Sequence, residues 1–380
     1  MIKVLQIIPT LDQSGAEKQM TLLATHLPRE EFDVHVAVLT RTGPLAGQLD
    51  AAGVPYTLIN KKAKLDLIAY WRLKKLIREI KPDIVHTWLF AGNSYGRAAA
   101  LACKVPVIFA GERCVDPWKG RGHFMIDRYL APKTTAIITN SSGVVDFYSQ
   151  NGIPADKFAV IPNAVVMPTE KLQSESLTRE QVFEELGIAP AKHLVGMVAR
   201  LWPQKRIKEA VWAADMLKFA GEDVQFVVFG DGPQADELVR YRNSIRINDR
   251  VHFFGHRADV SRFMPHFDVL WCTSAYEGQS NSILEAMSFG VPVVASDIPG
   301  NRDLVEHDVT GFLTPEHGDD PNRRSRDMVK RTTQIFEDPA KKAELSQASM
   351  KKIAEHFKLE KMIARHAELY REKLKGKSIK

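Results

Sequence analysis

The stretch Val269–Asp297, VLWCTSAYEGQSNSILEAMSFGVPVVASD, contains a complete strand–helix–strand unit and decides the fold class. Its apolar run Val269–Cys272 predicts a buried strand, and a helix is expected from Ser282 to about Phe289. Gly290 and Pro292 follow in positions typical of a helix end, and another apolar run comes directly after them. Two apolar strands joined by a crossover helix indicate a parallel sheet.

Apolar runs of the same kind recur along the whole chain, separated by helical stretches such as Glu17–Leu27, Leu65–Ile80 and Asn93–Ala102. The first half contains KVLQIIP, DVHVAVLT, PYTLIN, DIVHTW, VPVIFAG, TAIITNS and FAVIPN. A polar stretch after Pro162, NAVVMPTEKLQSESLTREQ, indicates a linker. The second half contains HLVGMVAR, VQFVVFGDG, VHFFG, VLWCTSA, VPVVASD and GFLTP. This alternation predicts an α/β protein with two Rossmann-like doubly wound domains facing each other across a cleft, at about 1–165 and 170–360.

The composition fits a soluble globular protein large enough for two cores. The chain has 380 residues, of which 44% are apolar and 26% charged. No apolar stretch approaches the roughly 18 residues of a membrane-spanning helix, and the first apolar run is too interrupted for a signal peptide. Three widely spaced cysteines indicate neither a disulfide framework nor a zinc site, and favour the cytoplasm. A net charge of +6, spread along the chain, gives no reason to expect nucleic acid as a partner.

The one dense basic stretch is Lys61–Lys81, in which Lys and Arg alternate with Leu65, Leu67, Ile68 and Trp71. One interpretation is a helix packed on a sheet with a solvated basic face. The other is a basic amphipathic helix that makes peripheral contact with an anionic membrane, at its inner face. Both interpretations remain open at this stage.

A candidate anion site lies between the strand and the helix of the opening segment. The loop Gly278–Ser282 is small and polar, and its amides together with the first helical turn suit a phosphate. Glu285, about one turn into the helix, can accept hydrogen bonds from a diol, and Glu277 faces the opposite end of the phosphate. The alternative is that Ser282 and Glu285 form a capping box, which needs no ligand.

Arg200 and Lys205 follow another predicted strand, in GMVARLWPQKR. A guanidinium and an ammonium at the carboxyl end of a strand can neutralise a diphosphate without a metal. Either residue alone is better explained as a solvated surface charge. The interpretation as a site depends on both lying beside the anion-binding helix.

At this point the sequence resembles a known family. EGQSNSILEA matches the E-x7-E signature of the family 4 retaining glycosyltransferases, and Arg200 with Lys205 match the phosphate-binding pair of that family. VFGDGP, VHFFGH and GVPVVASDIPGNRDLVEHDVTGFL also resemble family segments, as does SGAEKQ near the amino terminus. The resemblance covers nearly the whole chain. It implies the GT-B fold, with an N-terminal acceptor domain that the helix at 360–380 joins and a C-terminal donor domain.

The resemblance also implies a role for each matching residue. Glu285 would hold the ribose hydroxyls, and Glu277 would contact the transferred sugar. Arg200 and Lys205 would stabilise the departing diphosphate, and Gly15 would let the first domain approach it. The remaining donor-binding residues are the backbone amides and neighbours in the loop and first turn, and the base-binding loop: Gln279, Ser280, Asn281, Ser282, Ile283, His256 and Arg257.

The implied reaction moves a hexose-type sugar from a UDP- or GDP-sugar to a glycan or lipid-linked acceptor, in cell-envelope or exopolysaccharide synthesis. Family members retain the anomeric configuration by a front-face reaction, in which the leaving phosphate helps to deprotonate the acceptor. No D-x-D pair lies at a strand end, and Asp319 with Asp320 is expected to face solvent. Neither a metal nor another cofactor is therefore expected.

The first half departs from the family pattern. Many members carry a histidine after the strand VPVIFAG, where this chain has Glu112 and Arg113. Either Glu112, expected to be catalytic, or Arg113 takes the sugar-facing role, or the acceptor subsite differs. The alternative for both is an ion pair at the end of the strand. Lys119, Arg121 and His123 are expected on a mobile loop, where they meet an acidic or lipid-phosphate acceptor or remain solvated.

Other functions fit parts of the pattern. A sugar-nucleotide epimerase shares the two-domain plan, and a non-catalytic nucleotide-sugar binding protein would explain the missing histidine. A glycosyl phosphorylase would need a pyridoxal lysine context that the sequence does not show. A dinucleotide-dependent oxidoreductase is disfavoured because FGDGPQ lacks the third glycine of the dinucleotide fingerprint.

Overall fold

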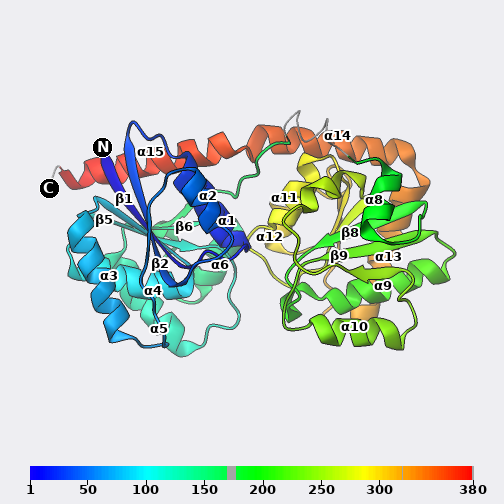
Figure 1. Ribbon diagram of the computed structural model, residues 1–380, viewed down its shortest axis with the longest axis horizontal. Helices are drawn as coiled ribbons and strands as arrows, with labels where there is room; N and C mark the ends of the chain where they lie inside the picture. Colours follow the sequence, from blue (N-terminus) through cyan, green and yellow to red (C-terminus); the bar gives the residue numbers. More distant parts are fainter. Residues whose placement is uncertain (169–176, 319, 379–380) are drawn as a thin grey trace. The chain divides into compact units, whose positions relative to one another are not determined.

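The computed structural model describes residues 1–168, 177–318 and 320–378 (Figure 1). The chain divides into two compact units, Met1–Ala164 with Leu359–Lys380, and Val165–Lys358. Each unit is a parallel sheet with helices on both faces. This confirms the predicted α/β class with two Rossmann-like domains. Part of the predicted linker, residues 169–176, lies outside the described residues, as does Asp319.

The first unit contains a seven-stranded sheet in the order β3-β2-β1-β4-β5-β6-β7. Every neighbouring pair of its strands is parallel. Each apolar run predicted in this half lies on a strand: β1 (Ile2–Thr10), β2 (Phe32–Arg41), β3 (Tyr56–Leu58), β4 (Ile84–Trp88), β5 (Val107–Glu112), β6 (Ala136–Thr139) and β7 (Phe158–Val160).

Right-handed crossovers distribute the helices of the first unit over the two faces of this sheet. One face carries α1 (Gly15–His26), α2 (Ala46–Ala51) and α15 (Leu359–Ser378), and the other carries α3 (Leu67–Ile80), α4 (Leu89–Ala102), α5 (Arg121–Leu130) and α6 (Ser142–Gln150). The final helix α15 belongs to this unit because it buries Met362, Ile363 and Tyr370 in the core beneath α1.

The second unit contains a six-stranded parallel sheet in the order β10-β9-β8-β11-β12-β13. Its strands are β8 (His193–Val198), β9 (Val224–Phe229), β10 (Val251–Phe253), β11 (Val269–Cys272), β12 (Val293–Ser296) and β13 (Phe312–Thr314). Its helices are α8 (Arg179–Leu186), α9 (Ile207–Phe219), α10 (Ala235–Ser244), α11 (Asn281–Ser288), α12 (Pro299–Arg302), α13 (Pro321–Glu337) and α14 (Pro339–His356).

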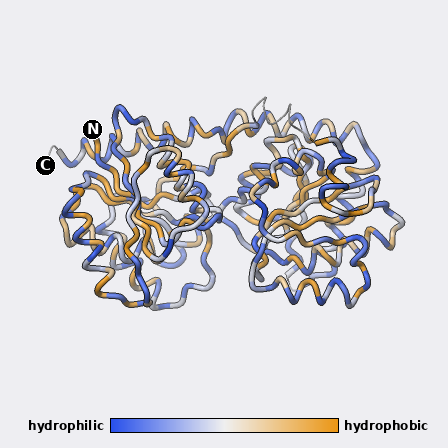
Figure 2. Tube along the Cα trace, in the orientation of Figure 1, coloured by the Kyte–Doolittle hydropathy of each residue, from blue (hydrophilic) through white to orange (hydrophobic). Residues whose placement is uncertain are grey.

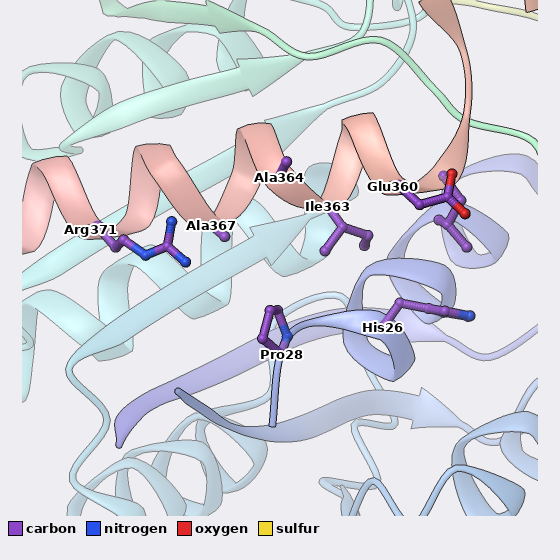
Figure 3. A pocket seen from close by; sticks show the side chains of 8 residues that line it. His26, Pro28, Glu360, Ile363, Ala364, Ala367 and Arg371 are labelled. Atoms are coloured by element: carbon purple, nitrogen blue, oxygen red, sulfur yellow. The ribbon is translucent and has the colours of Figure 1, made fainter. Parts of the chain in front are cut away.

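The strands are apolar along most of their length because both faces of each sheet are covered. Figure 2 shows this as hydrophobic colouring concentrated on the strands of each unit. In the second unit, Val227 and Leu270 pack under α11, whereas Val195 and Phe226 pack under α9. The alternation of side chains along each strand therefore supplies two cores per sheet.

The strand order also fixes where a ligand would bind in each unit. In open α/β sheets, ligands bind at the carboxyl edge where the chain reverses its direction of winding. That point lies between β1 and β4 in the first unit and between β8 and β11 in the second. The predicted cations follow β8 and the predicted carboxylates follow β11, so the sheet topology brings both sets to one edge.

Candidate active site

The loop after β8 holds both predicted cations. Leu201 N donates to Asp231 O at 3.0 Å, which ties this loop to the end of β9. Arg200 is exposed, with its guanidinium 5.0 Å from the ring centre of Trp202. Lys205 ends the short 3-10 helix Pro203–Lys205, and Arg206 after it adopts a left-handed backbone (φ 48°). Lys205 therefore lies before α9, which begins at Ile207, and not within it.

The loop after β11 fixes Glu277 against the same turn. The Ser274 hydroxyl donates to Glu277 Oε1 at 2.8 Å. Gln204 Nε2 donates to Tyr276 O at 2.6 Å, and Ala275 N donates to Gln204 O at 2.8 Å. The backbones of the two loops are thus hydrogen-bonded to each other at the switch point of the sheet.

Lys205 and Glu277 form a direct ion pair between Nζ and Oε1. The side chains are 20% and 9% exposed, so both charges are partly withdrawn from water. An ion pair in this setting is stronger than one on the open surface, because less solvent screens it. The cation predicted for the diphosphate and the carboxylate predicted for the sugar are therefore paired with each other.

The helix α11 begins one residue earlier than predicted, at Asn281, with Ser280 as its N-cap. Ser282 is consequently inside the first turn, so the alternative interpretation of Ser282 and Glu285 as a capping box is wrong. Ser280 provides no side-chain cap, and Leu284 N donates to Ser280 O as the first helical hydrogen bond. The backbone amides that precede Leu284 in the first turn have no acceptor within the helix. Amides in this position can donate hydrogen bonds to a bound anion.

The remaining predicted donor contacts of this segment differ in exposure. Gln279 and Ser280 are buried, while Asn281, Ser282 and Glu285 are half-buried. The Ile283 side chain is fully buried in the core under α11. Ile283 can therefore offer a ligand its backbone amide and not its side chain.

The backbone of α12 packs closely against the loop that contains Glu277. A Cβ added to Gly300, in α12, would lie 2.1 Å from Gly278 O and 2.9 Å from Glu277 O. Ser296 at the end of β12 donates through its hydroxyl to Ser274 O at 2.5 Å. A side chain at position 300 would push the loop, so glycine is needed there for the carboxylate to keep its position.

The predicted base-binding loop follows β10. Gly255 adopts a left-handed backbone (φ 65°), and its carbonyl accepts from Gly230 N at 2.7 Å. His256 is exposed, whereas Arg257 makes a two-pronged contact with Asp259 (2.9 and 2.8 Å). That contact lowers the pKa of the Asp259 carboxyl to about 2. The Arg257 guanidinium is already committed to protein carboxylates, so its predicted contact with a ligand would have to form beside them.

In the first unit, the predicted glycine lies at the corresponding switch point. Gly15 is the first residue of α1 and is exposed, directly after Ser14 as N-cap. Glu17 in the same turn is buried and receives hydrogen bonds from the Ser14 and Thr10 hydroxyls. Burial raises the pKa of the Glu17 carboxyl.

Glu112 ends β5 and is buried within a charged network. Asn93 Nδ2 donates to its Oε1 at 2.9 Å, the Tyr148 hydroxyl lies 2.7 Å from its Oε2, and Lys119 Nζ lies 3.4 Å from both oxygens. Burial raises the pKa of the Glu112 carboxyl, against the effect of Lys119. Burial lowers the pKa of Lys119, but the carboxylates of Glu112 and Asp127 together raise it above its usual value.

This network corrects the prediction for the segment after β5. The Lys119 side chain is fully buried and also contacts Asp127 at 3.1 Å, so it does not extend from a solvated loop. Arg121 and His123 lie in the first turn of α5 and not in a loop. Asp320 is exposed, as expected, and its carboxylate also caps α13 by accepting from Arg323 N at 3.0 Å.

Arg113 differs from its neighbour Glu112. Its Nη2 donates to Asn163 Oδ1, and its guanidinium lies 5.2 Å from the ring centre of Trp88. Among the described residues, its Nε and Nη1 are buried without a hydrogen-bond partner. Burial lowers the pKa of Arg113 to about 9. A buried guanidinium with two unsatisfied donors is costly unless a ligand completes it.

Several site residues have no signal in the sequence. Gln204 and Ser274 position Glu277, and Asn93 and Tyr148 position Glu112, yet each is an ordinary polar residue in an unremarkable pattern. Only the three-dimensional contacts identify them. For Gly300, the sequence offers one hint, because glycine after Pro299 at a helix start suggests close packing.

Comparison with solved structures defines the class of fold. A crystal structure of HepE from Anabaena in complex with UDP and glucose superposes with a TM-score of 0.83 at 22% identity, covering 98% of this chain and 100% of HepE. This likeness places the chain in the GT-B class. No helix in the described ranges is both long and apolar enough to cross a membrane.

Sequence comparisons identify the family. The family model described as Glycosyltransferase Family 4 matches residues 13–167, and the one described as Glycosyl transferases group 1 matches residues 178–352. The UDP-Gal:alpha-D-GlcNAc-diphosphoundecaprenol alpha-1,3-galactosyltransferase of Escherichia coli is 30% identical over 81% of this chain and 82% of its own. The N,N'-diacetylbacillosaminyl-diphospho-undecaprenol alpha-1,3-N-acetylgalactosaminyltransferase of Campylobacter jejuni is 24% identical over 71% and 72%. The chain belongs to the family 4 glycosyltransferases, and its activity is glycosyl transfer.

Proposed function

We propose that the protein is a retaining, metal-independent glycosyltransferase that moves a hexose-type sugar from a UDP- or GDP-sugar to a lipid-linked acceptor in cell-envelope or exopolysaccharide synthesis. The observation that carries this proposal is the Lys205–Glu277 ion pair beside the first turn of α11. One sheet edge thus contains a cation that can bind a diphosphate, a carboxylate that can accept hydrogen bonds from sugar hydroxyls, and helix amides that can bind a phosphate.

In the proposed reaction, the donor diphosphate takes the place of Glu277 as the partner of Lys205. The carboxylate released from the pair then accepts hydrogen bonds from the sugar. The bond from the anomeric carbon to the phosphate oxygen breaks, and a bond to the acceptor oxygen forms on the same face. The acceptor proton passes to the departing phosphate, whose charge Lys205 and Arg200 stabilise.

The lipid-linked acceptor is proposed from the relatives. The E. coli and C. jejuni enzymes are named for diphosphoundecaprenol-linked substrates. Among the described residues, Arg113, directly after β5, has two buried N–H donor atoms without a partner, whereas Glu112 is committed to Lys119 and Asn93. We therefore assign the acceptor-facing role to Arg113, with Glu112 supporting the loop that follows β5.

Removing the cation tests the proposal most directly. Lys205→Ala should lower turnover about 100- to 1000-fold, the usual effect of losing one group that stabilises a charged transition state. The measurement is nucleotide release from UDP- and GDP-sugars, with and without a polyprenyl-diphosphate-linked sugar, and the configuration of the product by NMR. An exposed lysine of α9, Lys208→Ala, is the matched control.

The same assay separates the alternative functions. Epimerised donor without transfer would indicate an epimerase, and donor binding without turnover on any acceptor would indicate a binding protein. An inverted product would contradict the retaining mechanism. Activity that depends on a divalent cation and persists in Lys205→Ala would contradict the metal-independent site.

A further inference from the structure

Four large apolar side chains are exposed at the start of α3 and in the segment before it. Leu65, Leu67, Ile68 and Trp71 are 89%, 75%, 65% and 58% exposed. The helix cannot turn them inward, because its opposite side buries Ala69, Leu73 and Ile77. An apolar surface held in water by its own helix indicates a binding partner.

Two anchors at the start of α3 fix this orientation. Asp66 caps the helix by accepting from Ala69 N at 2.9 Å, and Asp66 N lies 2.6 Å from the hydroxyl of Tyr95 on α4. The interpretation of this stretch as a helix packed on the sheet with a basic outer face accounts for its buried side and its exposed cations, but not for its exposed apolar side chains. Its outer face contains large apolar side chains as well as basic ones.

The helix α5, in the same layer, also exposes large apolar side chains. On α5, Met125, Ile126 and Tyr129 are exposed, and Trp118 is exposed just before it. The single acid of the helix, Asp127, points inward, where its carboxylate contacts Arg97 at 2.7 Å and Lys119 at 3.1 Å. The buried network around Glu112 thus holds α5 with its apolar side outward.

The two exposed faces lie on the same side of the sheet. The helix α4 packs against both α3 and α5, and the right-handed crossovers put all three on one face (Figure 1). Trp118 packs edge-to-face on Phe90 at the start of α4, with ring centres 5.7 Å apart. The apolar side chains of α3 and α5 therefore flank one helix of the first unit.

The charge on this surface is strongly basic. Exposed cations surround the apolar side chains of both helices: Lys62, Lys64, Arg72, Lys75, Arg121 and Arg128. Within Leu67–Ile80 and Arg121–Leu130, the one exposed acid is Glu79 in the last turn of α3. Aromatic and aliphatic side chains bordered by long cationic ones match the interface of an anionic bilayer, where the tips reach lipid phosphates and the apolar groups enter the acyl boundary.

We propose that the outer faces of α3 and α5 form one docking surface for membranes rich in anionic phospholipids. The proposal stands apart from the enzymatic function, because vesicles without donor or acceptor suffice to test it. If the acceptor is lipid-linked, this surface would also hold the first unit at the bilayer that contains it.

The test is co-sedimentation of the full chain with phosphatidylcholine vesicles that contain or lack about 30 mol% phosphatidylglycerol. Binding should be at least about tenfold tighter to the anionic vesicles and should weaken strongly in about 0.5 M salt, which screens the lipid charge. Equal binding to both vesicles, or no binding to either, would overturn the proposal.

Variants separate the contribution of the apolar side chains to vesicle binding from that of the cations. Ile68→Ser with Trp71→Ser, and Arg72→Glu with Lys75→Glu, should each weaken vesicle binding about tenfold or more. Phe219→Ser, at a 95% exposed apolar residue of the second unit, is the matched control and should bind as the parent does. Circular dichroism checks the fold, and nucleotide release checks the active site independently. Unchanged vesicle binding in both double variants, or a dimer that these variants dissociate, would contradict the proposal.

Discussion

The two switch-point edges use charged residues in opposite ways. In the second unit, the side chains of Lys205 and Glu277 are 20% and 9% exposed and form an ion pair between the segments that follow β8 and β11. At the edge of the first unit, Glu112 and Lys119 are buried, and their partners come from α4, α5 and α6. The comparison shows that charge at a sheet edge is not by itself a catalytic signal.

The largest expected effect is on the buried network. Lys119→Met removes the ammonium shared by Glu112, Asp127 and Asp116 and leaves their carboxylates together in a dry site. Breaking a buried pair in this way costs about 3–5 kcal/mol. Native-state hydrogen exchange of the β5 amides should report this loss within the first unit, without requiring two-state unfolding of the whole chain.

Arg113→Met is the matched comparison, because it removes a buried cation whose Nε and Nη1 have no partner among the described residues. Its loss should cost much less stability or raise it, while transfer to the acceptor falls and acceptor-independent nucleotide release persists. If Arg113→Met destabilised β5 as strongly as Lys119→Met, Arg113 would belong to the structural network and its assignment to the acceptor would be wrong.

An effect of intermediate size is expected on the pH dependence of the stability of the first unit, which contains His366. His366 on α15 is buried beside His86, and burial lowers its pKa to about 3, with the Arg113 cation acting in the same direction. The unfolded chain takes up this proton below about pH 6.5, but the folded chain does not until about pH 3. Stability is therefore complete above about pH 7 and falls as the pH decreases through this window, by about 2 kcal/mol between pH 7.5 and 5.

The measurement is the stability of the first unit between about pH 7.5 and 5, monitored by hydrogen exchange of its backbone amides during thermal unfolding. His366→Gln should make the acid-side slope shallower, whereas His356→Gln should not, because the His356 side chain is 62% exposed. Hydrogen bonding within α15 is retained in part, since the glutamine amide can replace the imidazole as a donor to Met362 O. Identical slopes in the parent and in His366→Gln would show that this histidine is already protonated in the folded state.

The sequence was sufficient for the fold and for the expectation that the cations after β8 and the carboxylates after β11 meet at one sheet edge. Strand runs such as VQFVVFGDG are apolar along their length and end in glycine, so periodicity and turn residues determine them locally. Burial of a charge is not encoded locally, and this is why Lys119 was misplaced. Its environment is assembled from Asp127 and Tyr148, which are 8 and 29 residues away. The sequence left open whether the apolar side chains at the start of α3 are exposed, because amphipathic spacing indicates two faces without showing what covers each.

The smallest effects concern α11, which the E-x7-E segment was expected to form either as part of a ligand site or with a capping box. Ser280 and not Ser282 is the N-cap of α11, so Ser282→Ala should change stability by less than about 0.5 kcal/mol, although a true cap would lose about 1 kcal/mol. Glu285→Ala should instead weaken nucleotide-sugar binding about tenfold by calorimetry, as expected for the loss of a carboxylate that accepts hydrogen bonds from a diol. If Glu285→Ala bound the donor as well as the parent, the carboxylate would have a role only within the protein. The functional edge of the second unit would then be limited to Lys205, Glu277 and the amides of the first turn.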